Sequence, residues 1–269
     1  MSTLKERGQE YLRSIAMLHM PSNARRYTWK VIMLDFGTTM MGFNVDHSPF
    51  EGKVVAFNDE FVVIKTGRSE FRLLDRSLIK DDSIPDIGNT IKVTPYHRRE
   101  FDGTNLGAPK ETRHADGFTT TSFALGKDTS ELPINKADLK SEYLKDMIKQ
   151  VEHIKMPDGM RTIAQAMIDY GAMADEVRFV DPTDDDIIKT PPALIFNVNT
   201  TKFFGELEIA YDRAMDAYDI KISSVNTTEV KECLFFDDLG TTIADLIDDG
   251  KWKFAKIETL KAVKLKKAA

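Results

Sequence analysis

The chain has 269 residues, of which 42% are hydrophobic and 30% charged, and its formal net charge is -6. This composition is typical of a globular protein with room for two domains. The single cysteine, Cys233, excludes an internal disulfide and favours a reducing, cytoplasmic setting. No apolar stretch approaches the roughly 20 residues that span a bilayer, and the N-terminus lacks the apolar core of a signal peptide. We therefore expect no membrane contact.

Residues 1–25 predict an N-terminal helix that ends before the break at Pro21, Ser22 and Asn23. Apolar side chains recur there at helical spacing, with Leu4, Tyr11, Ile15 and Leu18 near one face. The helix is expected to pack that face on the domain that follows it.

Residues 26–126 predict a small β-barrel domain of the SH3-like or OB-like kind. Short β-branched and aromatic runs alternate there with tight turns. The expected strands cover 26–34, 40–45, 54–57, 61–65, 70–74 and 91–94, with 117–125 as a further candidate. Residues 97–116 have no apolar periodicity and predict a long basic loop, which we expect to form an exposed arm.

Residues 134–260 predict an acidic α+β domain with a mostly antiparallel sheet, so that the whole chain is of the α+β class. Helices are expected over 135–154, 160–173 and 238–248, and strands over 177–180, 194–198, 206–211, 218–222, 230–235 and 252–258. Residues 126–133 are typical of a linker between the two domains.

Basic and aromatic side chains are interleaved in and near the long loop. Barrels that bind single strands combine a cationic groove with rings on which bases stack. The sequence therefore predicts a nucleic-acid site made of Arg68, Arg72, Tyr96, Arg98, Arg99, Phe101, Lys110 and Arg113. In the alternative interpretation, the rings belong to the core and the arginines pair with neighbouring carboxylates such as Glu70, Asp75 and Glu100.

A second hypothesis is a protein-interaction surface on the acidic domain. Tyr211, Asp216 and Tyr218 lie around one predicted hairpin, and tyrosine is favoured at interfaces because it supplies contact area at low entropic cost. Asp237 and Asp238 add negative charge near the start of a predicted helix. Together with the acidic run at 181–186, they could meet a basic host protein or imitate nucleic acid.

A third hypothesis is a carboxylate-metal phosphodiesterase, because Asp181, Asp184, Asp185 and Asp186 are ligands that Mg²⁺ or Ca²⁺ could accept. The run lacks the glycine and terminal glutamate of a calcium loop, and a capped surface turn is the alternative. The sequence contains no Gly-rich phosphate loop, HExxH or GxSxG. We expect no catalytic residue and no cofactor, and we expect Cys233 to be a buried, inert thiol within an apolar strand.

Three runs carry a resemblance: GKVVAFNDEFVVIKTGRSEFRLLDRSLI (52–79), GNTIKVTPYHRREFDG (88–103) and FDDLGTTIADLIDDGKW (236–252). They resemble accessory proteins of conjugative plasmids, integrative elements and phages, whose small β domains include the KfrB-type barrel. The resemblance implies a mobile-element protein in DNA maintenance, transfer or counter-defence, and it assigns no functional residue. The leading expectation is therefore a non-enzymatic nucleic-acid-binding accessory protein.

Overall fold

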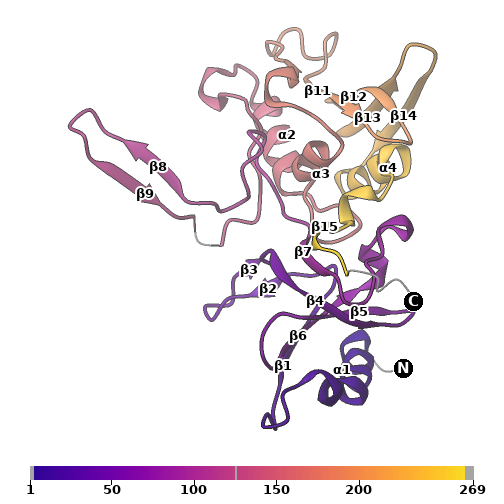
Figure 1. Cartoon of the computed structure of the whole chain (residues 1–269). Helices are drawn as coiled ribbons and strands as arrows, with labels where there is room; N and C mark the ends of the chain where they lie inside the picture. The colour runs from indigo at the N-terminus through magenta and orange to yellow at the C-terminus, as the bar shows by residue number, and fades with distance from the viewer. Residues whose placement is uncertain (1–2, 125, 264–269) are drawn as a thin grey trace. The chain divides into compact units, whose positions relative to one another are not determined.

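The structure is a computed structural model that describes residues 3–124 and 126–263. It divides into two compact units (Figure 1). Unit 1 comprises the chain up to Tyr96 together with the segment that starts at Lys251, and unit 2 comprises His97–Gly250. Unit 2 is therefore an insertion within the sequence of unit 1. The ranges expected from the sequence, 26–126 and 134–260, differ from these units at both ends.

Unit 1 contains a six-stranded sheet with the order β1-β6-β5-β4-β7-β15. Its strands are β1 (Thr28–Ile32), β4 (Phe50–Phe57), β5 (Phe61–Lys65), β6 (Glu70–Asp75), β7 (Thr90–Thr94) and β15 (Lys256–Lys261). β1 runs parallel to β6, and every other neighbouring pair is antiparallel. The predicted strand at 252–258 thus begins later and belongs to unit 1, where it pairs with β7.

The sheet of unit 1 is buried on both faces. Along β5, Phe61 and Val63 point to one cluster while Val62 and Ile64 point to another, as the two-residue period of a strand requires. The helix α1 (Leu4–Ile15) covers the first cluster with its Leu12 side chain. A capping box formed by Thr3 and Glu6 begins this helix. The predicted helical stripe is wrong at Leu18, which lies on the surface.

The structure confirms a mixed α+β fold with mostly antiparallel sheets, but it does not confirm the barrel. Among the described residues, β1 and β15 are the two ends of the strand order and no pairing joins them. β4 pairs with β7 through residues 50–53 and with β5 through residues 53–57, and its register with β5 shifts between Val54 and Ala56. Short strands joined by tight turns give the same sequence pattern in an open sheet as in a barrel.

Unit 2 contains a five-stranded antiparallel sheet with the order β10-β11-β12-β13-β14. The strands are β10 (Arg178–Val180), β11 (Ala193–Asn199), β12 (Phe204–Asp212), β13 (Ala217–Ser223) and β14 (Thr228–Leu234). The helices are α2 (Glu142–His153), α3 (Ile163–Asp169) and α4 (Phe236–Ile247). All three helices pack on one face of the sheet (Figure 1). The other face carries polar side chains such as Glu208 and Lys221.

Two expected boundaries in unit 2 are corrected. α2 begins after Ser141, whose hydroxyl accepts the amide of Leu144, whereas Asn135 caps only a short 3-10 turn. The expected linker at 126–133 is packed into unit 2: the buried Ser130 hydroxyl donates to the carbonyl of Arg99, and the amide of Leu132 donates to Glu152. These contacts explain why the units do not divide there.

Two small hairpins and six short 3-10 helices complete the fold of residues 3–124 and 126–263. The hairpins are β2 (Gly37–Thr38) with β3 (Asn44–Val45), and β8 (Lys110–Arg113) with β9 (Thr119–Ser122). The 3-10 helices are η1 (Ala16–His19), η2 (Arg76–Leu78), η3 (Asp81–Ser83), η4 (Lys136–Asp138), η5 (Ala174–Glu176) and η6 (Lys251–Lys253). β9 lies within the strand expected at 117–125, whose residue 125 is outside the described residues.

Candidate functional site

The predicted nucleic-acid residues are divided between the two units, and those of unit 1 are engaged in its own packing. The Arg72 guanidinium lies 4.5 Å from the centre of the Phe50 ring. The Tyr96 ring contacts Trp252 edge-on, with 4.8 Å between ring centres. Arg68 is exposed and donates to the side chain of Asn23 at 2.7 Å. Of these three, Arg68 is the one on the surface.

Within unit 2, the phosphate contact predicted for Arg98 is wrong, because this side chain is only 2% exposed. Arg99 is directed to Asp169, with 3.0 Å between nitrogen and oxygen. Phe101 is half-buried against the core of unit 2. Lys110 and Arg113 lie on the solvent-exposed strand β8. Of the five predicted contacts, Arg98 is buried and Phe101 is half-buried, whereas Arg99, Lys110 and Arg113 are exposed.

The predicted arm is a two-stranded ribbon rather than an irregular loop. β8 and β9 pair in register from Lys110 with Ser122 to Arg113 with Thr119, and all eight residues are exposed. Figure 1 shows the ribbon projecting from the rest of unit 2. Phe118 beside the turn is also exposed. Lys110 and Arg113 share the ribbon with Glu111 and Asp116, so its charges are mixed.

The acidic run at 181–186 has structural contacts. Asp181 accepts the amides of Lys140 and Ser141 at 2.8 and 2.9 Å, next to the start of α2. Thr183 donates to Asp186 at 3.1 Å, and Asp184 and Asp185 are exposed. Among residues 3–124 and 126–263, no group of three or more His, Cys, Asp or Glu side chains is placed to hold a metal ion.

A buried ionic cluster lies beside α3. The fully buried Arg161 contacts Asp158 at 3.0 Å, Asp169 at 3.2 Å and Asp248 at 2.8 Å. Burial acts to lower the pKa of Arg161, yet Tyr170 and the three carboxylates hold that pKa above its usual value. Arg161 therefore stays charged and joins residues that are distant in the sequence. These ion pairs give the cluster a structural role, which is to hold distant parts of unit 2 together.

The clearest binding-site geometry in unit 2 is a hollow of about 530 Å³, which we call the tyrosine pocket. Its residues come from α2, the β12–β13 hairpin and the β14–α4 corner: Tyr143, Asp146, Gln150, Tyr211, Met215, Asp216, Tyr218, Phe235 and Phe236. The rings of Tyr143 and Tyr211 are stacked with 5.6 Å between centres, and Tyr218 lies 5.4 Å from Tyr211. The predicted residues Tyr211, Asp216 and Tyr218 therefore converge.

The β12–β13 turn fixes the polar groups of this pocket. Asp212 accepts the amides of Ala214 and Met215, which closes the turn. Asp216 follows with a left-handed φ of 50°, a conformation that aspartate tolerates better than most residues. Its carboxylate accepts the Tyr211 hydroxyl at 2.6 Å. The Tyr218 hydroxyl donates to Gln150 of α2.

Tyr211 and Tyr218 are neutral over the physiological pH range. Burial raises the pKa of Tyr218 to about 12. Burial, followed by the hydrogen bond to Asp216, also raises the pKa of Tyr211. Because the tyrosines keep their protons, the negative charge of the pocket comes from Asp146 and Asp216. Asp146 also forms a surface ion pair with Lys149 at 2.9 Å.

The wall of the pocket is apolar and accessible. Phe235 is 65% exposed, and Phe236 and Met215 are also on the surface. The predicted residues Asp237 and Asp238 follow in the first turn of α4 and are exposed. Exposed aromatic and methionine side chains are typical of surfaces that a partner covers.

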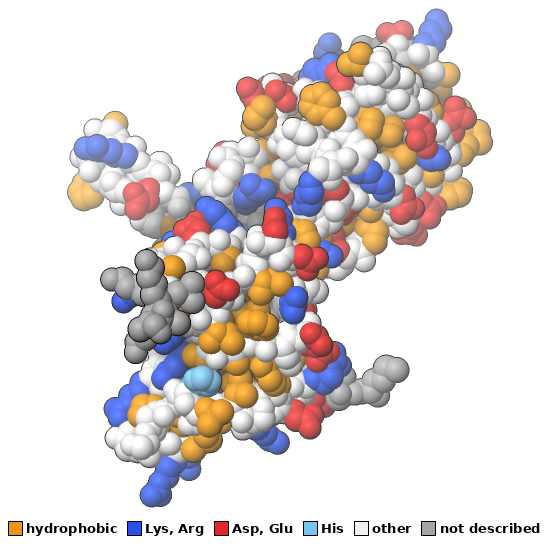
Figure 2. Space-filling model, turned by 45° about the vertical axis from the view of Figure 1, so that its right-hand side comes forward, with side chains coloured by type: hydrophobic (Ala, Val, Ile, Leu, Met, Phe, Trp, Pro, Cys, Tyr) orange, Lys and Arg blue, Asp and Glu red, His pale blue; other side chains and the backbone are white. Residues whose placement is uncertain are grey.

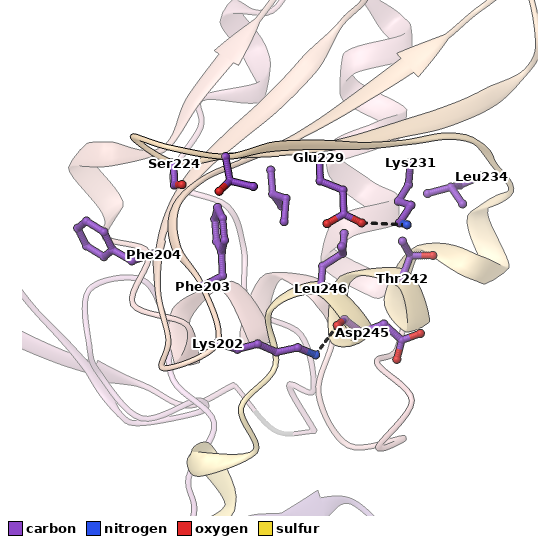
Figure 3. A pocket seen from close by; sticks show the side chains of 12 residues that line it. Lys202, Phe203, Phe204, Ser224, Glu229, Lys231, Leu234, Thr242, Asp245 and Leu246 are labelled. Atoms are coloured by element: carbon purple, nitrogen blue, oxygen red, sulfur yellow. Dashed lines mark hydrogen bonds and ion pairs between the residues drawn. The ribbon is translucent and has the colours of Figure 1, made fainter.

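A second hollow, of about 790 Å³, lies between β14 and α4, and we call it the α4 groove (Figure 3). Phe203, Leu234 and Leu246 provide its apolar part. Glu229 and Lys231 of β14 form an ion pair of 2.9 Å at its wall, and Lys202 donates to the carbonyl of Asp245. Leu234 lines this groove while Phe235 and Phe236 line the tyrosine pocket, so the β14–α4 corner borders both hollows.

The sequence did not predict several residues of the tyrosine pocket. Tyr143 lies in the apolar stripe of a helix, which favours a core position, and Gln150 carries no motif. Two adjacent phenylalanines, Phe235 and Phe236, were a usable signal, because neighbouring residues at a helix start cannot both face one core. The prediction for Cys233 is wrong: the thiol is exposed, since a β-bulge turns this residue away from the core with φ 58°.

The described part of the chain contains no helix long and apolar enough to cross a membrane. Comparison of the chain with protein-family models, with curated proteins and with solved structures finds no match. The case for a function therefore depends on the geometry of these sites.

Proposed function

We propose that the protein is a non-enzymatic interaction module that binds a basic segment of a partner protein in the tyrosine pocket. The observation that supports this proposal best is the convergence of three tyrosines, two exposed phenylalanines and two carboxylates on one hollow of unit 2. The resemblance to accessory proteins of mobile elements suggests a partner from the host or from the element itself.

A basic occupant fits the chemistry of the pocket. Aromatic faces attract a Lys or Arg cation within about 6 Å of the ring centre. Arg213 already provides an example, because its guanidinium lies 5.1 Å from the centre of the Tyr143 ring. Asp237 and Asp238 extend the acidic character beyond the pocket. An interfacial charge can then be matched by carboxylates while its aliphatic stem packs on Phe235.

Labelled peptides of equal length, one rich in Arg and Lys, one neutral and one acidic, test the proposal by fluorescence anisotropy. We expect the basic peptide to bind the protein and the acidic peptide not to bind. Tyr211→Ala should weaken binding of the basic peptide about tenfold, since it removes the central ring. Glu208→Gln, on the opposite face of the sheet, is the matched control and should leave affinity unchanged.

Equal loss of affinity in Tyr211→Ala and Glu208→Gln would show that the peptide does not bind in the pocket. If the protein binds all three peptides equally, or binds none of them, the partner is not a basic segment. Because the two substitutions lie on opposite faces of one sheet, the comparison also controls for the fold of unit 2.

Nucleic-acid binding is the second candidate, and the ribbon β8–β9 is the observation that favours it. The major groove of DNA admits a two-stranded β-ribbon, and Lys110 and Arg113 could contact phosphates from its exposed surface. Against it, Lys and Arg side chains are scattered among Asp and Glu on the face drawn in Figure 2, rather than gathered into one broad basic area. Phosphate contacts dominate such affinity.

The ribbon can be tested with labelled single- and double-stranded oligonucleotides at about 50 mM salt, where phosphate contacts are strongest. If the ribbon binds nucleic acid, the double variant Lys110→Ala/Arg113→Ala should abolish the signal, while Tyr211→Ala should retain it. Absence of binding by the unaltered protein would remove this candidate. The carboxylate-metal alternative has no supporting geometry among the described residues, and we do not propose it.

A further inference from the structure

β14 is an edge of the unit 2 sheet. It pairs with β13 on one side, and among the described residues no strand pairs with its other side. Six of its seven residues are exposed, and its third residue, Val230, is 46% exposed. Such an edge presents a row of N–H and C=O groups that can pair with a strand of another chain.

The sequence of this edge is complementary to itself. Residues 228–232 are Thr-Glu-Val-Lys-Glu. When two copies lie antiparallel with Val230 opposite Val230, each Glu229 lies opposite the Lys231 of the second copy. Moving the centre by one residue places Lys231 opposite Lys231, or Glu229 opposite Glu229. Opposite charges at facing positions stabilise a strand pair and like charges destabilise it, so the charges select the first register.

We propose that two copies of this chain associate by antiparallel pairing of β14 with β14, about a two-fold axis at Val230. This is an isologous contact, the commonest kind in protein dimers. The pairing is confined to 228–232, because the bulge at Cys233 interrupts the strand. A charged edge with a bulge resists strands of arbitrary sequence, whereas a second copy supplies the matching charges.

The pairing would also extend the α4 groove. Facing residues of antiparallel strands point to the same face of a sheet, so the two-fold axis is perpendicular to it. The α4 helices of the two copies then lie on the same face of one continuous ten-stranded sheet. Glu229 and Lys231 both face the groove and are already 2.9 Å apart (Figure 3). In the dimer, the four charges at the axis would form one network between the two grooves.

Analytical ultracentrifugation of the full chain over a range of concentrations tests the proposal. We expect a dimer that dissociates on dilution. Lys231→Glu places like charges opposite each other twice and should raise the dissociation constant roughly tenfold to a hundredfold. The charge-swapped variant Glu229→Lys/Lys231→Glu restores complementarity and should restore the dimer. Lys221→Glu on β13 carries the same change in charge away from the edge and should dimerise normally.

A monomer at all concentrations up to about 100 µM, which corresponds to an association weaker than most specific contacts, would overturn the proposal. A dimer that responds equally to Lys231→Glu and Lys221→Glu, or that the charge swap does not restore, would also overturn it. Circular dichroism checks that each variant is folded. Because the tyrosine pocket is unaltered in all of them, the result is independent of peptide binding.

A cysteine pair checks the register. In the Cys233→Ser background, Val230→Cys should form an intermolecular disulfide with oxidised glutathione, which accepts the two electrons and two protons of the paired thiols. Facing residues of antiparallel strands are about 4.5–5.5 Å apart at Cα, which suits a disulfide. Glu229→Cys and Lys231→Cys should each cross-link poorly alone and efficiently when mixed. Strong cross-linking of Lys231→Cys with itself would contradict the proposed axis.

Discussion

The two units use their sheets differently. The sheet of unit 1 has apolar clusters on both faces. Large side chains such as Phe61 and Phe71 are therefore buried in its own core. The sheet of unit 2 is covered by helices on one face only, and the β14–α4 corner leaves Phe235 and Phe236 on the surface. Apolar side chains that the fold does not bury are the ones that remain for a partner.

The units also differ in what their interiors contain. Unit 2 buries the charged cluster of Arg161, whereas among the described residues of unit 1 the buried polar side chains are those of His47 and Asn89. Both tryptophans, Trp29 and Trp252, belong to unit 1, while Tyr143, Tyr170, Tyr211 and Tyr218 belong to unit 2. Tryptophan fluorescence can therefore follow unit 1, whereas the tyrosine signal comes from both units, because Tyr11, Tyr27 and Tyr96 lie in unit 1.

The largest effect is expected for Arg161→Leu. It leaves the carboxylates of Asp158, Asp169 and Asp248 without their common cation, and breaking a buried ion pair from one side costs about 3–5 kcal/mol. Urea unfolding followed by circular dichroism should show the loss. Arg178→Leu, which breaks an exposed pair with Glu206, is the control and should cost less than about 1 kcal/mol. Equal losses would contradict the structural role of the cluster.

The second-largest effect is expected at alkaline pH, which should lower the stability of unit 2. The pKa of Tyr218 is about 12 in the folded protein because of burial, against about 10 in an unfolded chain. Between these values the unfolded state loses a proton that the folded state keeps, so stability is full below about pH 10 and falls as pH rises to about 12. The loss should reach about 2.7 kcal/mol. Tyr218→Phe has no proton to lose and should show a smaller slope in urea unfolding.

Gly52→Ala probes the double-faced sheet of unit 1. A methyl group at this position would lie 2.5 Å from the carbonyl oxygen of Lys65 and 2.7 Å from a side-chain carbon of Ile64. The strand pair β4–β5 must shift, and we expect a loss of about 1–3 kcal/mol in tryptophan-detected unfolding. Gly67→Ala meets only the flexible Glu70 side chain at 3.2 and 3.3 Å and is the control. A loss that tryptophan fluorescence does not detect would contradict the assignment of Gly52 to unit 1.

The smallest expected effect is a gain in the stability of unit 2. Cys233 has a φ of 58° at the bulge of β14, where glycine has no steric penalty. Cys233→Gly should stabilise unit 2 by about 1 kcal/mol in urea unfolding. Cys233→Ala removes the same thiol but keeps a side chain, and it should bring no gain. If both variants gain equally, the thiol and not the backbone is responsible.

Local patterns in the sequence predicted most strands and all four α-helices of the described residues. The reason is that the hydrophobic periods of strands and helices involve residues that are close in the sequence. They did not predict that β15 pairs with β7, since this contact joins strands on either side of unit 2. For the site, Tyr211, Asp216 and Tyr218 share one hairpin and were found together. Tyr143 and Phe235 meet them only through packing of α2 and α4 on the sheet, which spacing along the chain does not encode.

The insertion of unit 2 between β7 and β15 has a consequence for biosynthesis. The ribosome delivers β7 early, yet its neighbour at the sheet edge emerges only after all of unit 2 has been made. Unit 2 has its complete set of elements first, and domains generally fold as they appear. A nascent chain stopped after Gly250 should therefore display the tyrosine pocket while the edge of β7 is still open to a chaperone.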